Sequence, residues 1–442
     1  MLLFIPVLIF FVYRWTVDLY GVLAGCVACA LVAFSPNLLA HAGLATVDFA
    51  LAALLTAAAY TAWRWCQAPS ARRAAVAGCI AWFAVGSKYS ALGYLPVFLA
   101  GFFLLSRWHG RAHTNPGGTG AVQAGASQLL LFSASALLAL WACFGFEARP
   151  LRDPSRRPYT RMDRVVPPGS SLSRTLYWVA EEVPIPLQDA ATGVSWVFGH
   201  ARQGHAAFLL GEVGRRGWWH YFPVVLAVKT PLPFLLLIAV AGISFLWRND
   251  RPPGSLGPWV AAAGVLLVSM TSPINVGVRH LLPMYPLLAI SAASCFGRGG
   301  ERRRPRLTMA LGLLLLGWHA GESWAARPDY PSYFNSFARG SEHEVLGDSN
   351  LDWGQDLHRL ARYTESHGID ELHLDYFGAT SPAAVGLGHA EPFGPQDRPR
   401  GWVAISVTHL QGIYQPPPAW LEGREPRAKI GKSIWLYYIG GD

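Results

Sequence analysis

Charged residues are scarce in this 442-residue chain: Asp, Glu, Lys and Arg together make up 14%. A soluble enzyme of this size carries about a quarter. Hydrophobic residues make up 52% of the chain, and the few charges gather between long apolar runs. Runs of about 17–25 apolar residues are candidate transmembrane helices. The composition therefore excludes an ordinary soluble enzyme and predicts a polytopic membrane protein.

Cysteine is absent from the long polar stretches, so a disulfide framework is not expected. The pair Cys26 and Cys29 forms a Cys-x-x-Cys motif, but within an apolar helix small-residue packing is favoured over redox chemistry. All the cysteines lie in or beside apolar runs: Cys26, Cys29, Cys66, Cys79, Cys143 and Cys295.

A signal peptide is also missing, because Met1 opens directly into "LLFIPVLIFF" without a basic n-region or a cleavage site. Two interpretations stay open. The first segment is a short native helix, or the N-terminal part of the protein lies upstream of Met1.

Ten apolar segments are predicted to cross the membrane: 1–14, 18–36, 46–66, 73–87, 89–106, 127–146, 219–246, 257–273, 280–297 and 307–325. They divide the chain into four regions. Residues 1–146 form a first helix block, 147–218 a long polar loop, 219–325 a second helix block, and 326–442 a soluble α/β domain.

Lys and Arg concentrate in alternate connections, which the positive-inside rule assigns to the cytoplasm. The opposite short connections hold Lys88 and Arg279. The loop 147–218 and the C-terminal region are therefore predicted to face the exterior, or periplasm, of a cell-membrane protein. The basic positions are Arg14, Arg64, Arg72, Arg73, Arg107, Arg111, Arg248, Arg251 and the "GRGGERRRPR" cluster. This placement explains the net charge of +9 without nucleic acid as a partner.

The C-terminal region is polar, with more acidic than basic residues. "EVLG" is predicted to form a short strand, and "DWGQDLHRLARYTESHG" an amphipathic helix that ends at Gly368. "ELHLDYFG", "GWVAISVTHL" and "KSIWLYYIG" have the β-branched and aromatic residues of strands.

Within "VLGDSNLDWGQDLHRL", residues Asp348, Asn350 and Asp352 have the spacing of the first ligands of an EF-hand loop. The loop would also need Gly at its sixth position and Glu at its twelfth, where this chain has Trp353 and Arg359. No metal site is predicted. Asp352 and Gln355 instead fit the N-cap and third position of a capping box.

The same stretch resembles the C-terminal exterior domain of bacterial membrane glycosyltransferases related to protein O-mannosyltransferases, which form glycosyltransferase family 39 in the GT-C superfamily. Five segments match in order: "SPNLLAHAGLATVDFALA", "GSKYSAL", "LLGEVGRRGWWHYFPVVLAVKTPLP", "INVGVRHLLPMYP" and "SNLDWGQDLHRLARY" followed by "YFG". The resemblance implies a GT-C-like helical core and transfer of a sugar, such as a mannose-like hexose, from a polyprenyl-phosphate carrier to an acceptor hydroxyl. The donor is the lipid-linked substrate, and no other cofactor is expected.

This reaction needs a carboxylate as general base and cations that hold the lipid phosphate. Asp48 is the candidate acidic residue of the catalytic cavity, where it would support the reacting groups or lie at the acceptor site, because ionisable groups inside apolar segments are costly and usually functional. His41 lies seven residues earlier. The alternative is that Asp48 only caps the helix that begins near Val47.

Six residues are the candidates for binding the lipid phosphate or the substrate: His41, Lys88, Glu212, Lys229, Arg279 and His280. Snorkelling to lipid headgroups would also explain the positions of Lys88, Arg279 and His280. Lys229 lies well inside the segment 219–246, where a buried lysine needs a partner or a water-filled cavity. Glu212 precedes that segment and is predicted to face the same cavity.

The chain departs from the family pattern at its start. Family members begin with one more helix and a first exterior loop that carries an Asp-Glu pair, and the Asp is the usual base. This sequence holds no such segment, so it is expected to be a fragment of an active enzyme or a non-catalytic relative. The alternative function is a lipid- or glycan-binding scaffold on a GT-C-like core. A transporter ranks last, because no internal repeat is evident.

Overall fold

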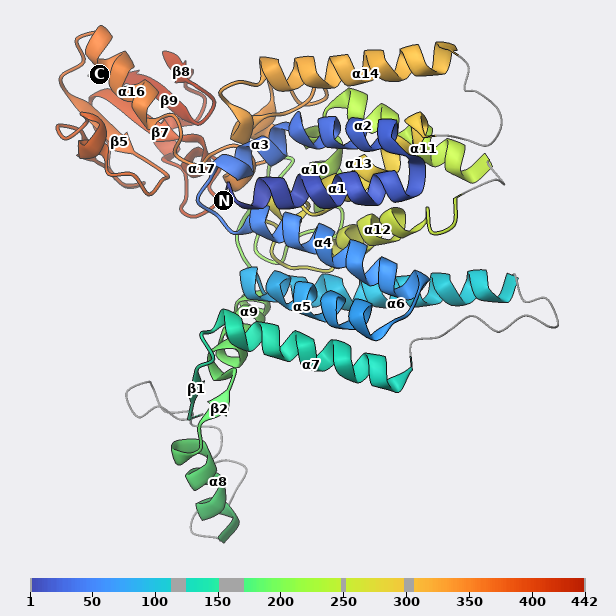
Figure 1. Cartoon of the computed structure of the whole chain (residues 1–442). Coiled ribbons are helices and arrows are strands. Elements are labelled where there is room, and N and C mark those ends of the chain that lie inside the picture. Colours follow the sequence, from blue (N-terminus) through green and yellow to red (C-terminus); the bar gives the residue numbers. More distant parts are fainter. Residues whose placement is uncertain (1, 113–124, 151–170, 248–251, 298–305, 441–442) are drawn as a thin grey trace. The chain divides into compact units, whose positions relative to one another are not determined.

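A computed structural model describes residues 2–112, 125–150, 171–247, 252–297 and 306–440. The described chain is mostly helical and forms two compact units, Met1–Thr56 with Gln203–Asp442, and Ala57–Arg202 (Figure 1). The first unit thus joins segments far apart in the sequence. The basic positions Arg248 and Arg251 and the cluster at 298–305 lie outside the described residues.

The helical core of the first unit is built around α13 (Met284–Ala292), all of whose residues are buried. A helix that is apolar all round is stable only when other elements cover every side. Helices α1, α2, α11 and α12 contact α13. The core helices are α1 (Phe4–Tyr20), α2 (Val22–Ala33), α3 (Pro36–Gly43), the start of α4 (Asp48–Gln67), α10 (Tyr221–Lys229), α11 (Leu232–Trp247), α12 (Gly257–Met270), η2 (Val278–His280), α13, η3 (Ala293–Phe296) and α14 (Arg306–Ala325).

The predicted break between residues 14 and 18 is wrong. Helix α1 runs through both positions, with Arg14 and Asp18 paired across one turn at 3.4 Å. The break comes instead at Gly21, whose φ of 89° is a conformation that glycine adopts without a Cβ clash. The segment predicted at 18–36 also ends early, and α2 and α3 meet at a 60° bend.

The segment predicted at 219–246 is not one helix, because α10 and α11 meet at a 113° bend before Pro231. A bend leaves backbone carbonyls without helical partners. Side chains satisfy them here: Asn335 Nδ2 donates to Ala227 O (2.6 Å) and Thr230 O (2.7 Å), and Asn37 Nδ2 donates to Lys229 O (2.7 Å). The bend is therefore held by residues from distant parts of the sequence.

The second unit contains the helix predicted at 73–87, which the structure describes as α5. Gly78 of α5 meets the backbone carbonyl of Phe132 in α7, so a Cβ at this position would clash. The predicted loop 147–218 contains helices as well as loop, and its residues 151–170 lie outside the described residues. The elements are α5 (Ala71–Ser87), α6 (Ala91–Ala112), α7 (Ala126–Cys143), β1 (Ala148–Arg149), α8 (Ser171–Glu182), β2 (Ile185–Pro186) and α9 (Gln188–Gln203).

Two helices in the described part of the chain are long and apolar enough to cross a membrane, at Ala91–Trp108 and Ala126–Cys143. The bent pairs α2–α3 and α10–α11 bring the number to four if each pair counts as one span. The ten membrane segments expected from the sequence stay a prediction.

The C-terminal region forms the expected small α/β domain, a five-stranded sheet in the order β6-β5-β7-β9-β8. Strands β6, β5 and β7 are parallel, while β9 runs antiparallel to β7 and β8. Helix α16 lies beside the sheet (Figure 1). Its Leu357 and Leu360 belong to the core on one sheet face. On the other face, Val403, Ile405 and Tyr437 form a second core, as the alternation along a strand requires.

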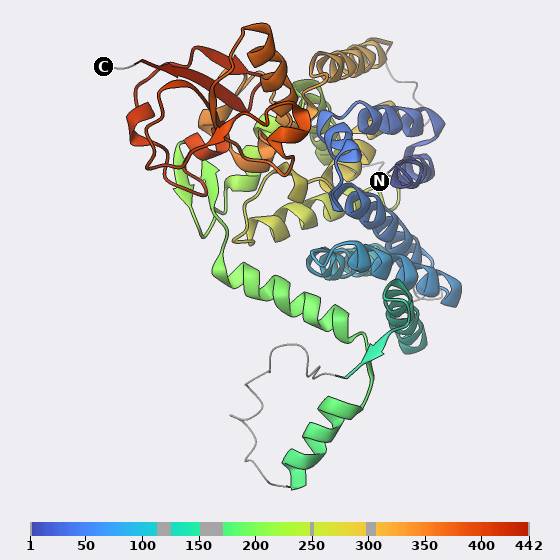
Figure 2. The ribbon, with the colours of Figure 1, turned by 90° about the vertical axis from the view of Figure 1, so that its left-hand side faces the viewer.

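A β-hairpin from the middle of the chain, formed by β3 and β4, contacts the C-terminal region. Strand β3 forms a bridge from Leu209 to Leu346, so the hairpin lies beside the start of the C-terminal domain (Figure 2). The elements are β3 (Ala207–Leu209), β4 (Glu212–Gly214), η4 (Tyr330–Ser332), α15 (Glu342–Val345), η5 (Asp348–Asn350), α16 (Leu357–Ser366), β5 (Leu372–Asp375), η6 (Pro382–Val385), β6 (Glu391–Pro392), β7 (Gly401–Ser406), α17 (Val407–Leu410), η7 (Ala419–Leu421), β8 (Ala428–Ile430) and β9 (Ile434–Ile439).

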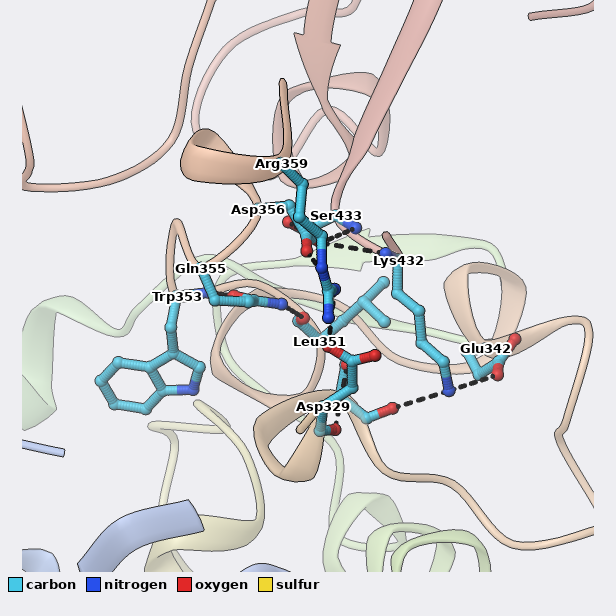
Figure 3. Close-up of polar contacts among 10 residues, drawn as sticks. Asp329, Glu342, Leu351, Trp353, Gln355, Asp356, Arg359, Lys432 and Ser433 are labelled. Carbon is cyan, nitrogen blue, oxygen red and sulfur yellow. Dashed lines mark hydrogen bonds and ion pairs between the residues drawn. The ribbon is translucent and has the colours of Figure 1, made fainter. Parts of the chain in front are cut away.

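The buried carboxylate of Asp356 ties α16 to the turn between β8 and β9 (Figure 3). Its Oδ2 accepts from Lys432 N (2.9 Å), Ser433 N (3.0 Å) and Ser433 Oγ (2.8 Å). Its Oδ1 accepts from Arg359 Nη1 at 2.6 Å, and the same nitrogen reaches Asp329. One side chain thus satisfies two backbone donors and one cation.

We expect Asp356→Ala to destabilise the C-terminal domain by about 3–5 kcal/mol, because these donors would be left buried without an acceptor. Hydrogen exchange of the β8 and β9 amides in the full chain measures the effect. The exposed Asp370→Ala is the matched control. Unchanged amide protection in Asp356→Ala would show that these hydrogen bonds do not stabilise the domain.

Candidate functional site

The segment 345–356 contains neither the predicted strand nor the predicted capping box. Val345 ends the short helix α15, and only Leu346 forms a β-bridge. Helix α16 begins at Leu357, after Asp356, so Asp352 is not its N-cap. Asp352 Oδ1 accepts from Gly354 N at 2.9 Å, and Gln355 Oε1 accepts from Trp353 N at 2.7 Å. Both side chains therefore hold a loop, because tertiary contacts of this segment outweigh its local helix signal.

Asn350 fastens this loop to the helical core. Its Oδ1 accepts from Val278 N, and its Nδ2 donates to the hydroxyl of Tyr221, each at 2.9 Å. The neighbouring Ser349 hydroxyl donates to the carbonyl of Val276. These contacts join the loop to α10 and to the segment around η2.

Lys229 completes the attachment from the core side. The side chain is fully buried, and its Nζ donates to Asn350 O at 2.6 Å and to Pro331 O at 3.0 Å. The ammonium also lies 4.4 Å from the ring centroid of Phe334. A buried cation needs such partners, and these are backbone carbonyls of the C-terminal region. The sequence called for a partner for this buried lysine, and the carbonyl groups of Pro331 and Asn350 are that partner.

Trp353 brings two predicted site residues together. The ring of His41, at the end of α3, meets the Trp353 ring edge-on at 5.7 Å between centroids. The guanidinium carbon of Arg279, in η2, lies 5.7 Å from the centroid of the same ring. The Trp353 indole N–H donates to Ser349 O at 2.8 Å, which fixes the ring (Figure 3 shows it beside Gln355).

The positive charge of Arg279 also acts on Tyr414. Tyr414 donates its hydroxyl proton to Asp348 Oδ2 at 2.6 Å. Burial and the Asp348 carboxylate raise the pKa of Tyr414, and the positive charge of Arg279 opposes them. Arg279 Nε is buried and has no hydrogen-bond partner among the described residues. Such a donor, next to an aromatic ring, fits an anionic oxygen.

Asp48 is the first residue of α4 and is 3% exposed. This position agrees with a structural role and with a functional role of Asp48. An acid in the first turn interacts favourably with the helix dipole, and a buried carboxylate is a typical functional group.

The other candidates are spread over the two units. His280 stacks its ring on Phe222, with centroids 5.9 Å apart and planes at 16°. Glu212 is exposed at the start of β4. Lys88 follows α5 in the second unit, where its backbone N–H closes the helix on Ala84 O. The structure describes this unit by itself, so Lys88 stays a prediction.

Sequence reasoning missed Trp353 and Tyr414 as residues of this site. Trp353 stands inside the quoted "LDWGQD" stretch, so a large aromatic residue in a polar loop was the available signal. Nothing local marks Tyr414, because its contact with Asp348 joins segments distant in the sequence.

No protein-family model and no curated protein matches the chain. Among solved structures, the chain is similar to ArnT from Cupriavidus metallidurans bound to undecaprenyl phosphate, with 12% identity and a TM-score of 0.47 over 100% of this chain and 84% of that one. It is also similar to the arabinofuranosyltransferase AftD from Mycobacteria, with 12% identity and a TM-score of 0.40 over 98% of this chain and 33% of that one. The similarity to these two structures is weak, with TM-scores below 0.5 and identities of 12%. It assigns no substrate to this chain.

The buried Asp352 predicts a pH dependence of stability. Burial raises its pKa to about 7, although hydrogen bonds from Gly354 and Thr408 lower it. An unfolded Asp has a pKa near ~3.9, so between about pH 4 and 7 the folded state binds the extra proton. The unfolding free energy therefore falls as pH rises through this window and levels off above it.

We expect this fall to amount to at most about 4 kcal/mol and to be reduced in Asp352→Asn. Thermal unfolding of both proteins from pH 4.5 to 8 measures it. Because other carboxylates titrate equally in both proteins, the difference between the two curves isolates Asp352. Parallel curves would contradict the raised pKa.

Proposed function

We propose that the chain is a multi-pass membrane glycosyltransferase that moves a sugar from a polyprenyl-phosphate carrier to an acceptor hydroxyl on the exterior face. The observation that supports it best is the Arg279 guanidinium, held beside Trp353 with an unpartnered buried Nε. Guanidinium groups bind phosphate through charge-assisted hydrogen bonds. In the proposal the ten membrane segments place the C-terminal domain outside, and the transferred sugar is a mannose-like hexose.

The proposed reaction breaks the bond between the anomeric carbon and the phosphate oxygen. The phosphate leaves with the electron pair, and Arg279 stabilises its charge, while the part of Lys88 stays a prediction from the sequence alone. The acceptor oxygen forms the new bond to the anomeric carbon, and its proton passes to Asp48. His41, in edge contact with Trp353, and His280 belong to the walls of this site, while Glu212 lies on the exposed hairpin.

Lys229 has a different role in the proposal from the one expected of a phosphate ligand. Its ammonium is already occupied by two carbonyl oxygens. We infer that it positions the loop that carries Trp353, and thereby Arg279.

We expect Arg279→Ala and Lys88→Ala each to weaken binding of polyprenyl phosphate by about 10–100-fold, the value of a charged hydrogen bond. Native mass spectrometry of the full chain in detergent, titrated with the lipid, measures the affinity. Arg362→Ala, an exposed arginine on α16, is the matched control. Unchanged binding in both variants would overturn the phosphate site.

Asp48→Asn separates the two readings of Asp48, because asparagine keeps a side-chain oxygen at the start of α4 but cannot take up the acceptor proton as a carboxylate does. We expect transfer of labelled sugar from the lipid donor to fall by about 10²–10⁴-fold. Lipid binding is expected to stay unchanged, and stability is expected to fall by at most about 1 kcal/mol, the value of the lost interaction with the helix dipole.

Full transfer activity in Asp48→Asn would leave only the capping role. If the full-length protein binds the lipid and transfers no sugar, the glycosyltransferase proposal fails, and the scaffold function replaces it.

A further inference from the structure

A second group of side chains lies in the C-terminal domain, at the edge of the sheet where the parallel strands end. Asp375 is the last residue of β5, and β5 pairs in parallel with β7, with Asp375 opposite Ile405. His409 lies in α17, directly after β7. Ligands of sheets with parallel strands bind beyond the carboxyl ends of those strands. We call Asp375, Phe377, His409, Tyr414 and Gln415 the strand-end cluster.

The polar half of the strand-end cluster is organised by one carboxylate. Asp375 Oδ1 lies 2.7 Å from His409 Nδ1, and Asp375 Oδ2 accepts from Gln415 Nε2 at 2.7 Å. This pairing assigns the proton of neutral His409 to Nδ1. The opposite ring nitrogen, Nε2, has no hydrogen-bond partner among the described residues, so it can accept from a ligand hydroxyl.

The aromatic half is a rigid platform. The rings of Phe377 and Tyr414 stack with centroids 5.5 Å apart and planes at 9°, and the His409 ring meets Phe377 edge-on at 5.8 Å. Tyr414 is 44% exposed. Its hydroxyl is fixed by Asp348 and by His205 at 3.2 Å, and the backbone N–H of Phe377 donates to Ser406 Oγ. The platform therefore stays open without collapsing into the core.

The charge around the strand-end cluster decides the class of ligand. Asp348 and Asp375 contribute carboxylates, and the buried Asp352 lies within electrostatic reach of His409. Among the described residues no Lys or Arg contacts Asp375, and the partners of its carboxylate are His409 and Gln415. An anionic ligand is therefore disfavoured. An exposed ring beside fixed donors and acceptors suits a neutral ligand with C–H faces and several hydroxyls.

We propose that the strand-end cluster is a saccharide-binding subsite of the C-terminal domain, in which a sugar ring stacks on Tyr414 and its hydroxyls bond to His409 and Gln415. The subsite uses none of the residues assigned to the lipid phosphate. Its binding is measured without turnover, so it stands or falls separately from the proposed sugar transfer.

Saturation-transfer difference NMR on the full chain in nanodiscs tests the subsite, with methyl hexopyranosides and their short oligosaccharides as probes. We expect signals on the sugar C–H protons and dissociation constants in the millimolar range. Tyr414→Ala and Gln415→Ala are expected to weaken binding at least tenfold. Tyr414→Phe keeps the ring and is expected to keep most of the binding.

Tyr438→Ala is the matched control, because Tyr438 is a similarly exposed tyrosine of the same domain whose ring contacts Trp402. Titrations of polyprenyl phosphate on the same samples show whether the lipid site is intact. Absence of sugar signals in the unchanged protein would overturn the subsite, as would equal binding by Tyr414→Ala. Binding of amino sugars alone would overturn the neutral ligand class.

Discussion

Lys229 is fully buried, and the two carbonyl groups that hold its ammonium belong to Pro331 and Asn350. A buried amine without partners is costly, so the segments around Pro331 and Asn350 that supply these carbonyls must stay against the helical core. The loop that contains Asn350 is also fixed through Val278 and Tyr221. Lys229 and Asn350, together with Ser349 on the carbonyl of Val276, therefore hold this loop on the core.

The candidate site follows from that attachment. Three residues after Asn350, Trp353 contacts His41 and Arg279, which come from separate helical segments of the core. Two residues before Asn350, Asp348 accepts from Tyr414 and so connects the core end to the strand-end cluster. A single loop thus determines the surroundings of the proposed phosphate ligand and of the proposed saccharide subsite, which explains why its sequence is dense in short polar residues.

The composition and apolar runs were enough to predict a helical protein with a small α/β domain, because burial and strand propensity are local signals. The same local signals did not predict where helices break. Helices α10 and α11 form one apolar run in the sequence, and the bend between them depends on Asn37 and Asn335, which lie in distant parts of the chain. Arg279 could be singled out as an isolated cation. His409 and Asp375 could not, because only the pairing of β5 with β7 brings them to 2.7 Å.

The central claim is that the Arg279 guanidinium holds the phosphate of a polyprenyl carrier. The most direct measurement is a cryo-electron microscopy structure of the full-length protein in nanodiscs with polyprenyl phosphate. We expect a phosphate with an oxygen about 3 Å from the Arg279 guanidinium, beside Trp353. A phosphate bound elsewhere, with Arg279 unchanged and without contact to the lipid, would contradict it.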